Sequence, residues 1–330
     1  MRRRPYFFEW FVAVQMIFIY IWFALRGPTI NSLVTQNILI SIAAVGVEAI
    51  AGALIRLVVE SIRGKRRQFI RSIWNVAWMT DTLRLAVFGG VLVGVYGGIK
   101  LVVPIYNHHL YDKQLWNLDS AMCGGFAPVI FTVNLFSQPR VLTFFDQAYA
   151  RIFFSSLNIA FTYVMSHPSR RVRVAFSDGN ALLWSIGAWL YLLVPSLGPA
   201  YFFPDVWIPI RAYMPVTNVY HAMLIQNYQS MLQLARSGSA KVTFLFGVAA
   251  FPSLHVAFQT FVFFWMRRLW ISGQVLFGAF SLIILIGSMI TGWHYLIDGL
   301  AGIALAALSY WIPARMWRIG RWSQLRSELR

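Results

Sequence analysis

Long apolar segments alternate with short clusters of basic residues along this chain. The segments reach or approach the roughly 20 apolar residues that a helix needs to cross a bilayer. The pattern therefore predicts an all-α fold, a polytopic transmembrane helical bundle of about eight spans. We place these spans near residues 7–25, 33–56, 84–105, 147–166, 180–199, 250–266, 274–291 and 294–313.

The composition supports a membrane protein over a soluble one. Hydrophobic residues make up 58% of the chain and charged residues 12%, whereas a soluble domain has about a quarter charged residues. The net charge of +17 does not indicate nucleic-acid binding, because the Lys and Arg residues lie in clusters between apolar segments. Cys123 is the single cysteine, which excludes an internal disulfide and a cysteine-based metal site.

The positions of the basic clusters predict the orientation in the membrane. They fall between alternate spans, and the positive-inside rule puts them, with both termini, in the cytoplasm. The long segments 106–146 and 200–249 contain few basic residues and are expected outside. We expect a single membrane domain over residues 1–330, in which 1–75 form the N-terminal spans and a basic loop and 76–330 form the core. The clusters are residues 2–4, 63–71, 169–173, 267–268 and 315–326.

The N-terminal segment has a basic start and an apolar stretch, as a signal peptide has. No small-x-small cleavage site follows this stretch, which is long and aromatic. We therefore expect a retained first span.

Two polar motifs interrupt the last apolar segments, "FPSLH" at 251–255 and "HYLID" at 294–298. The predicted topology places both near the extracytoplasmic face. His294 and Asp298 are four residues apart, so they share one helix face. We expect His294 to be hydrogen-bonded to Asp298. The imidazoles of His255 and His294 should lie within about 12 Å, the span of one phosphate and two contacts.

These residue types suit phosphate chemistry. A carboxylate beside an imidazole fixes its tautomer and supports a positive charge on it. Such a histidine serves as a nucleophile or general base, and a second histidine can exchange protons with the leaving group and acceptor. Ser253 and the amides that open the sixth span could hold a phosphate. Each feature alone is weak, because a boundary histidine is more often structural and the spacing of His and Asp recurs by chance.

Together the motifs resemble the second and third signature motifs of the phosphatidic acid phosphatase type 2 superfamily, over residues 247–302. The leucine in "PSLH" and the form "HYxxD" are similar to the inositol phosphorylceramide synthase branch, and sphingomyelin synthases share a similar "HYxxD". Upstream, "YDKQLWNLD" (111–119) and "PSLGPAYFF" (195–203) are compatible with that branch but less specific.

The resemblance implies a membrane lipid phosphotransferase that moves a phosphorylated head group, such as inositol phosphate, to a lipid or alcohol. His294 would be the nucleophile that forms a phosphohistidine, and Asp298 would orient it. His255 would be the general acid and then the base, and Ser253 would bind phosphate. Membrane lipids are the expected substrates. No nucleic acid, cofactor or obligatory protein partner is expected.

The chain also departs from the phosphatase pattern. Gly287 and Ser288 stand where the third motif has Ser-Arg, and the first motif, Lys-x6-Arg-Pro, is not found anywhere. Because these basic residues are missing, the motifs do not identify which side chains would bind the phosphate. We consider Arg211 and Lys241 as phosphate-binding candidates; Arg151 and Arg236 are further basic residues near the outer side. A solvated or headgroup-facing charge is the alternative for each of them.

Other functions remain open at this point. The same site could use water and act as a lipid phosphate or pyrophosphate phosphatase. A transporter or membrane scaffold could use these polar residues to line a pathway. A metal site at His108, His109 and Asp112 is disfavoured, because no further ligand follows at a useful spacing.

The predicted orientation can be tested by cysteine labelling or fusion reporters. Reporters at residues 61–68 and at Ser169 should report the cytoplasm, because both positions lie in basic clusters. A reporter at Ser237 should report the outer side. Labelling of position 237 only from the cytoplasm would overturn the orientation.

Overall fold

The computed structural model describes residues 7–25, 28–237, 242, 244–270 and 273–319, and for Pro28 and Thr29 the backbone only. The chain is all-α, 83% helical, with no strand in the described part. The longer helices are α1 (Phe7–Ala24), α2 (Pro28–Ile62), α4 (Val76–Tyr106), α7 (Pro139–Met165), α8 (Arg170–Leu193), α10 (Pro215–Ser237), α11 (Leu254–Leu269), α12 (Gly273–Ile290) and α13 (Leu296–Met316). The shorter ones are α3 (Arg66–Ile73), α5 (Asp112–Met122), α6 (Pro128–Leu135), α9 (Pro199–Phe202), η1 (Pro204–Val206) and η2 (Ile208–Tyr213).

Each expected span overlaps one long helix, and several apolar helices fit an integral membrane protein. Five helices in the described part, α1, α2, α4, α12 and α13, are long and apolar enough to cross a bilayer. The 18 residues of α1 correspond to about 27 Å at 1.5 Å per residue. The total of eight spans stays a prediction, because α7, α8 and α11 are more polar or shorter than these five.

Two expected spans need correction at their ends. The fifth helix of the predicted set, α8, covers Arg170–Leu193 and not 180–199, because Pro195 and Pro199 cannot continue a helix. The sixth, α11, begins at Leu254, so residues 250–253 precede it as a non-helical segment. The motif serine Ser253 is its N-cap, and its hydroxyl accepts a hydrogen bond from Val256 N.

Helix α4 is the most enclosed of the candidate spans. Of its most apolar window, 72% is buried inside the protein, against 17% for α2. It packs against α1, α2 and α8, while α13 packs against α8 and α11, and α12 against α7 and α11. Residues of α4 therefore face the interior of the bundle, while much of α2 has no protein neighbour.

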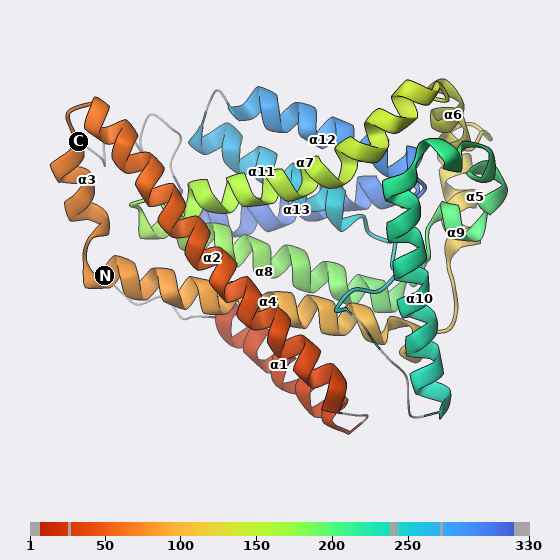
Figure 1. Cartoon of the computed structure of the whole chain (residues 1–330), viewed down its shortest axis with the longest axis horizontal. Helices are drawn as coiled ribbons and strands as arrows, with labels where there is room; N and C mark the ends of the chain where they lie inside the picture. The colour runs from red at the N-terminus through yellow and green to blue at the C-terminus, as the bar shows by residue number, and fades with distance from the viewer. Residues whose placement is uncertain (1–6, 26–27, 238–241, 243, 271–272, 320–330) are drawn as a thin grey trace.

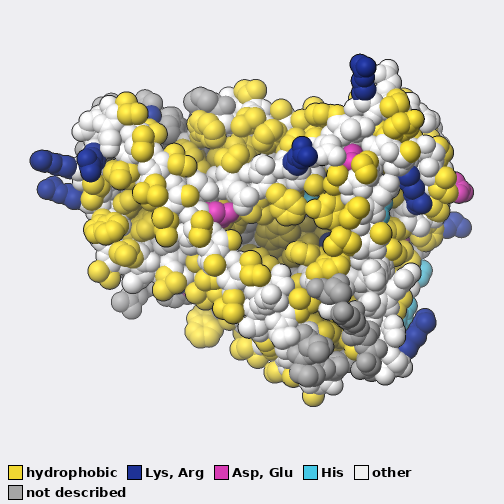
Figure 2. Space-filling model, viewed as in Figure 1, with side chains coloured by type: hydrophobic (Ala, Val, Ile, Leu, Met, Phe, Trp, Pro, Cys, Tyr) yellow, Lys and Arg dark blue, Asp and Glu magenta, His cyan; other side chains and the backbone are white. Residues whose placement is uncertain are grey.

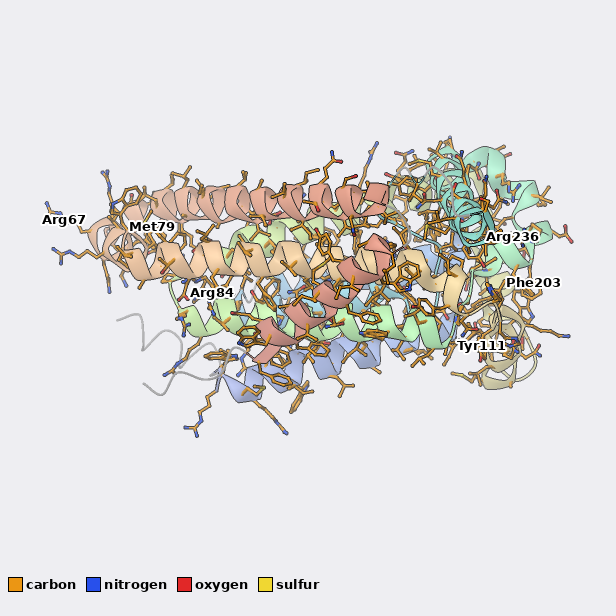
Figure 3. The ribbon with its side chains drawn as sticks, turned by 90° about the horizontal axis from the view of Figure 1, so that it is seen from below. Arg67, Met79, Arg84, Tyr111, Phe203 and Arg236 are labelled. Carbon is orange, nitrogen blue, oxygen red and sulfur yellow. The ribbon has the colours of Figure 1, made fainter. Side chains whose placement is uncertain are left out.

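The bundle has two different ends (Figure 1). At one end lie α3, the start of α8 and the ends of α11 and α13; at the other lie α5, α6, α9 and one end of α10. Figure 3 shows Arg67 and Met79 near the first end, and Tyr111, Phe203 and Arg236 near the second. Helix α10 was not expected, because its mixed polarity gave the segment 200–249 no span-like pattern.

Hydrophobic side chains cover much of the surface between these ends (Figure 2). Exposed large apolar residues are numerous on α1 and α2, where Trp10 is 70% exposed and Val47 is 65% exposed. Such a belt would be costly in water and is favourable against lipid. The same view shows a hollow with hydrophobic walls between α2, α7 and α10.

The two motif helices approach each other closely at Gly302 of α13. A Cβ atom added there would lie 2.5 Å from the carbonyl oxygen of Ser253 and 3.2 Å from Ala257 N. Only a residue without a side chain allows this contact. The approach brings the first turn of α11 next to the first turns of α13.

We expect Gly302→Ala to force α11 and α13 apart and to destabilise the protein by about 1–3 kcal/mol, the usual cost of overpacking. Gly46→Ala in α2 is the matched control, because a Cβ there meets nothing within 4 Å. The control should be neutral or stabilising by up to about 1 kcal/mol. Thermal unfolding in matched micelles measures both changes, and equal melting temperatures would contradict the close approach.

Candidate active site

The structure brings the two motif histidines together from separate elements. His255 lies in the first turn of α11, and His294 lies in the turn between α12 and α13. Their ring centroids are 6.0 Å apart, well within the separation expected from the sequence. The backbone N–H of Ser253 also donates to the carbonyl of Asp298, at 2.9 Å, so the two motifs are joined directly.

Asp298 faces His294, but the two residues do not share a helix face as expected, because α13 begins at Leu296 and His294 lies in the turn before it. Oδ2 of Asp298 lies 3.4 Å from His294 Nδ1, and the side chains are 0% and 3% exposed. The same oxygen accepts a hydrogen bond from Tyr295 N at 2.9 Å. The expected hydrogen bond between the two side chains is not formed in this geometry, because His294 Nδ1 has no hydrogen-bond partner. A movement of a few tenths of an ångström would bring the pair to the range of a charge-assisted bond.

Two aspartates of α5 hold the start of α13. Asp119 accepts hydrogen bonds from Leu296 N at 2.7 Å and Ile297 N at 2.8 Å. Asp112 accepts one from the hydroxyl of Tyr295 at 2.8 Å. These carboxylates satisfy amides that the first turn of a helix leaves unpaired and favour its positive end. These bonds fix residues 295–297, and because these residues directly follow His294, they also hold His294 in place.

The segment 195–198 links α5 to both motifs. Leu197 N and Gly198 N donate to the carboxylate of Asp112, at 2.9–3.2 Å. The hydroxyl of Ser196 accepts from Phe251 N, and its carbonyl accepts from Ala250 N. Gly198 has φ +99°, and a Cβ there would lie 2.5 Å from the carbonyl of Trp293. The weakly specific segments 111–119 and 195–203 are thus structural supports of the histidine pair.

His255 is surrounded by aromatic rings from α7. Its ring centroid lies 4.5 Å from that of Phe153 and 5.3 Å from that of Tyr149. His255 keeps part of its surface accessible, while His294 is buried. The pair therefore consists of a buried His294 and a half-buried His255.

The sequence analysis missed Lys100, which lies in the interior of α4. Its side chain is buried, its Nζ donates to the hydroxyl of Tyr96 at 3.2 Å, and its positive charge acts on both His255 and His294. A lysine inside a long apolar segment is a signal that was present in the sequence, since such residues usually face a partner or cavity. Nothing in the sequence linked this lysine to the motif histidines, at positions 255 and 294.

The other candidates lie in different places. Ser253 is fully buried, and its hydroxyl oxygen caps α11 while its proton remains free to be donated. Arg211 is exposed on η2, where its charge acts on His221 of α10. Lys241 falls outside the described residues. The phosphate-binding roles of all three stay predictions.

The alternative metal site is not formed by the described residues. His108 and His109 are exposed, whereas Asp112 is buried and engaged with 197–198 and Tyr295. No group of three or more His, Cys, Asp or Glu side chains in the described ranges has the arrangement of a metal site.

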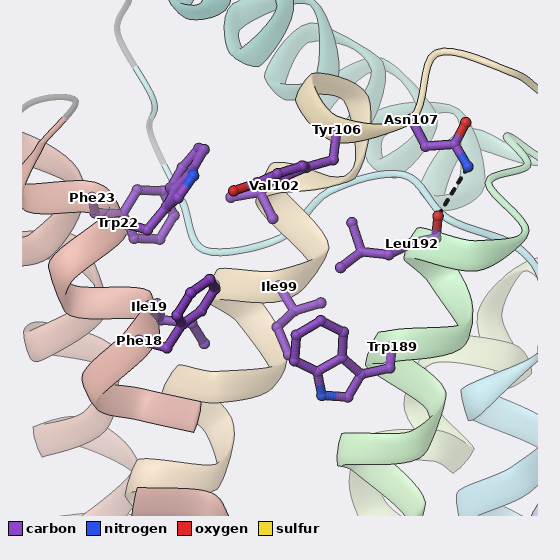
Figure 4. A pocket seen from close by; sticks show the side chains of 11 residues that line it. Phe18, Ile19, Trp22, Phe23, Ile99, Val102, Tyr106, Asn107, Trp189 and Leu192 are labelled. Carbon is purple, nitrogen blue, oxygen red and sulfur yellow. Dashed lines mark hydrogen bonds between the residues drawn. The ribbon is translucent and has the colours of Figure 1, made fainter. Parts of the chain in front are cut away.

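A separate apolar pocket of about 380 Å³ lies between α1, α4 and α8 (Figure 4). On α4 it uses Ile99, Val102 and Tyr106, whereas Lys100 and Tyr96 share another face of that helix. The hydrogen bond from Asn107 to the carbonyl of Leu192 closes one side, at 3.0 Å. The lining contains no Lys, Arg, His, Asp or Glu, so the pocket does not suit a phosphate.

Burial raises the pKa of the two α5 carboxyls. The pKa of Asp119 rises to about 6, because desolvation outweighs the hydrogen bonds from Ile297 and Leu296. Desolvation also raises the pKa of Asp112, against the hydrogen bonds from Leu197, Gly198 and Tyr295. The groups that support the site are therefore themselves sensitive to pH.

A family model described as the PAP2 superfamily matches residues 113–312, more than half of the chain. The matched region contains both histidine motifs and Asp119, and it begins after α4. Comparisons with curated proteins and with solved structures each give no match.

The raised pKa of Asp119 generates a prediction about stability. The folded state holds this proton up to about pH 6, whereas an unfolded aspartate loses it near pH 3.9. The contribution of Asp119 is therefore fully present below about pH 4 and is lost as the pH rises through about 6. Wild type should lose melting temperature relative to Asp119→Asn across this window, because the asparagine does not titrate.

Exposed Asp205 supplies the control, because Asp205→Asn should leave the pH dependence of wild type unchanged. The test is the melting temperature of all three proteins in one detergent, measured as a function of pH. Parallel curves for wild type and Asp119→Asn would show that Asp119 does not titrate in this window. Activity of Asp119→Asn should also fall, because an amide cannot accept from Leu296 N and Ile297 N as a carboxylate does.

Proposed function

The chain belongs to the PAP2 superfamily, an enzyme family of phosphatases and phosphotransferases, and we propose that it transfers a phosphorylated lipid head group through a phosphohistidine at His294. The observation that carries this proposal is the 6.0 Å separation of the His255 and His294 rings, with Asp298 behind His294. Two imidazoles at this separation suit one phosphorus centre between them.

In the first step, Nε2 of His294 attacks the phosphorus, since Nδ1 faces Asp298. The P–N bond forms and the bond from phosphorus to the leaving oxygen breaks. His255 in its protonated form gives its proton to that oxygen. Asp298 stabilises the positive charge that develops on the His294 ring.

In the second step, neutral His255 takes the proton of an acceptor hydroxyl, and the oxygen attacks the phosphohistidine. The new P–O bond forms, the P–N bond breaks, and His294 returns to its neutral form. An alcohol or lipid acceptor yields a new phosphodiester, whereas water yields a free phosphate ester. The same two residues thus serve transfer and hydrolysis.

Transfer is the version that we favour, in the manner of the inositol phosphorylceramide synthase branch. The "PSLH" and "HYxxD" forms support it, as does the absence of the phosphatase Ser-Arg pair at Gly287 and Ser288. A ceramide-like lipid is the corresponding acceptor. Hydrolysis of a lipid phosphate or pyrophosphate is the second candidate.

We place the site near the extracytoplasmic face. The histidine pair lies toward the end of the bundle that has α5, α6 and α9, away from the basic α3. The hydrophobic hollow between α2, α7 and α10 (Figure 2) would let a lipid approach from the bilayer plane. Lipid substrates then need not leave the membrane to react.

Substrate class can be determined by incubating purified protein with a panel of labelled phospholipids, with and without an alcohol acceptor. New labelled lipid that depends on the acceptor would support transfer. Release of a soluble phosphate ester, or of free phosphate from a lipid phosphate, without acceptor dependence would support hydrolysis. Turnover of no lipid in the panel, together with transport across vesicles, would favour a pathway role for these residues.

Substitutions separate the roles of the three residues. His294→Ala should abolish turnover, because no other group makes the covalent intermediate. His255→Ala should reduce turnover about 10²–10⁴-fold, the usual loss of general acid–base catalysis. Asp298→Asn should keep expression yet lose most activity, because the imidazole is poorly oriented. Product formation per mole of folded protein is the measurement.

A substrate with a nitrophenolate leaving group provides the control for these roles. This group leaves without a proton, so the first step should be partly rescued in His255→Ala and not in His294→Ala. Equal activity of all three variants on a good lipid substrate would end the phosphohistidine mechanism.

A further inference from the structure

The positions that correspond to the Ser-Arg pair of the third motif are tightly packed in this structure. A Cβ at Gly287 would lie 3.2 Å from the Tyr149 ring and 3.3 Å from the Phe145 ring, both on α7. Ser288 is fully buried, and its hydroxyl donates to the carbonyl of Leu285 at 2.8 Å. A phosphate at the histidine pair must therefore find its positive charge on another element.

Lys100 of α4 is a buried cation next to the pair. Its side chain is 8% exposed, and its charge acts on both His255 and His294. The chain segment that leads into "FPSLH" lies against the backbone of Lys100, since a Cβ at Gly247 would lie 2.8 Å from the Lys100 carbonyl. Lys100 is therefore packed beside this segment, and its charge acts on both motif histidines, although it precedes the family-matched region.

The charge of Lys100 is not neutralised by the protein. Within the described ranges no carboxylate lies at ion-pair distance from it. Its partners are the Tyr96 hydroxyl and the ring faces of Tyr96 and Tyr191, with Nζ 5.6 and 5.0 Å from their centroids. Cation–π contacts compensate only part of the desolvation of an ammonium group. An anion bound beside Lys100 would neutralise its positive charge.

The acids nearest the pair hold backbone amides. Asp112 and Asp119 accept from amides, and Oδ2 of Asp298 accepts from Tyr295 N, while its Oδ1 has no hydrogen-bond partner. None of the three carboxylates forms an ion pair with Lys100 in the described ranges. Lys100 therefore remains a buried cation without a carboxylate partner.

Tyr149 adds a second unsatisfied group beside His255. It is 6% exposed, and its hydroxyl has no hydrogen-bond partner. It interacts electrostatically with Tyr96, which bonds Lys100. A buried hydroxyl without a partner is costly, and such groups usually mark a missing ligand or water.

We propose that Lys100, assisted by the Tyr149 hydroxyl, binds the substrate phosphate between His255 and His294, in place of the motif arginines that this chain lacks. The proposal rests on the proposed function, because it assumes that a phosphate occupies this gap. Lys100 supplies the full positive charge, and Tyr149 donates a neutral hydrogen bond to a second phosphate oxygen. The clamp is thus built from α4 and α7, two elements that precede the signature motifs.

Phosphate binding tests this clamp without any turnover. The melting temperature of purified protein is measured against rising inorganic phosphate, with chloride at equal ionic strength as the blank. Wild type and His294→Ala should both be stabilised by phosphate, because a bound ligand favours the folded state. In Lys100→Met the phosphate affinity should fall about 10–100-fold, the loss expected for a charge-assisted hydrogen bond.

Further variants test whether a loss of phosphate affinity is specific to Lys100 and Tyr149. Lys100→Arg should keep part of the phosphate response, and Tyr149→Phe should weaken it severalfold with little change in fold. Exposed Lys113→Met should respond as wild type. If Lys100→Met does not fold, Lys100→Arg and Tyr149→Phe decide, and unchanged phosphate affinity in both would overturn the clamp.

The outcomes separate this proposal from the proposed function. A phosphate response in wild type that is lost in Lys100→Met supports the clamp, even if His294→Ala keeps activity and the phosphohistidine fails. An equal response in wild type and Lys100→Met overturns the clamp, whatever the activities are. Absence of any phosphate-specific response in wild type overturns it as well.

Discussion

Hydrogen bonds that two α5 carboxylates accept from backbone amides hold the segments around His294 in place. Asp119 binds the first amides of α13, and Asp112 binds the segment 197–198 and the hydroxyl of Tyr295. In a membrane protein such polar groups must be satisfied internally, because lipid offers no partners. The position of His294 depends on these bonds, since it directly precedes the helix that they hold. A short helix at one end of the bundle therefore determines the geometry of the histidine pair.

The second constraint is close packing between the motif helices. Gly302 lets α13 approach the backbone of Ser253, and the amide of Ser253 binds the carbonyl of Asp298. These contacts set the separation of His255 and His294. Phe153 and Tyr149 of α7 then limit the orientation of the His255 ring. The site combines a rigid pair of helices with an aromatic wall that leaves His255 partly accessible.

Charge is distributed unevenly around this pair. The buried acids are used to hold helix starts and the His294 ring, whereas Lys100 has tyrosines as its neighbours and no carboxylate in the described part. An enzyme that handles phosphate benefits from this arrangement, because the substrate itself supplies the negative charge. The unfavourable desolvation of the buried ammonium group is then compensated only when the substrate is bound. This links the proposed chemistry to a feature that stability alone does not explain.

Much of this protein could be predicted from the sequence. Apolar periodicity located the long helices, because span length is a local property. The motif residues His255, His294 and Asp298 were found because their spacing is local and resembles a known family, which the match over 113–312 confirms. The end of α8 is marked by Pro195 in the sequence, although hydropathy alone extended the span past it. The long helix α10, the supporting roles of Asp112 and Asp119, and the position of Lys100 were decided by tertiary structure. Each depends on contacts between residues far apart in the chain or on a boundary that hydropathy does not mark. A single lysine in an apolar segment shows that a partner is needed, and only the packing of α4 against α8 and the motif segment shows where it lies.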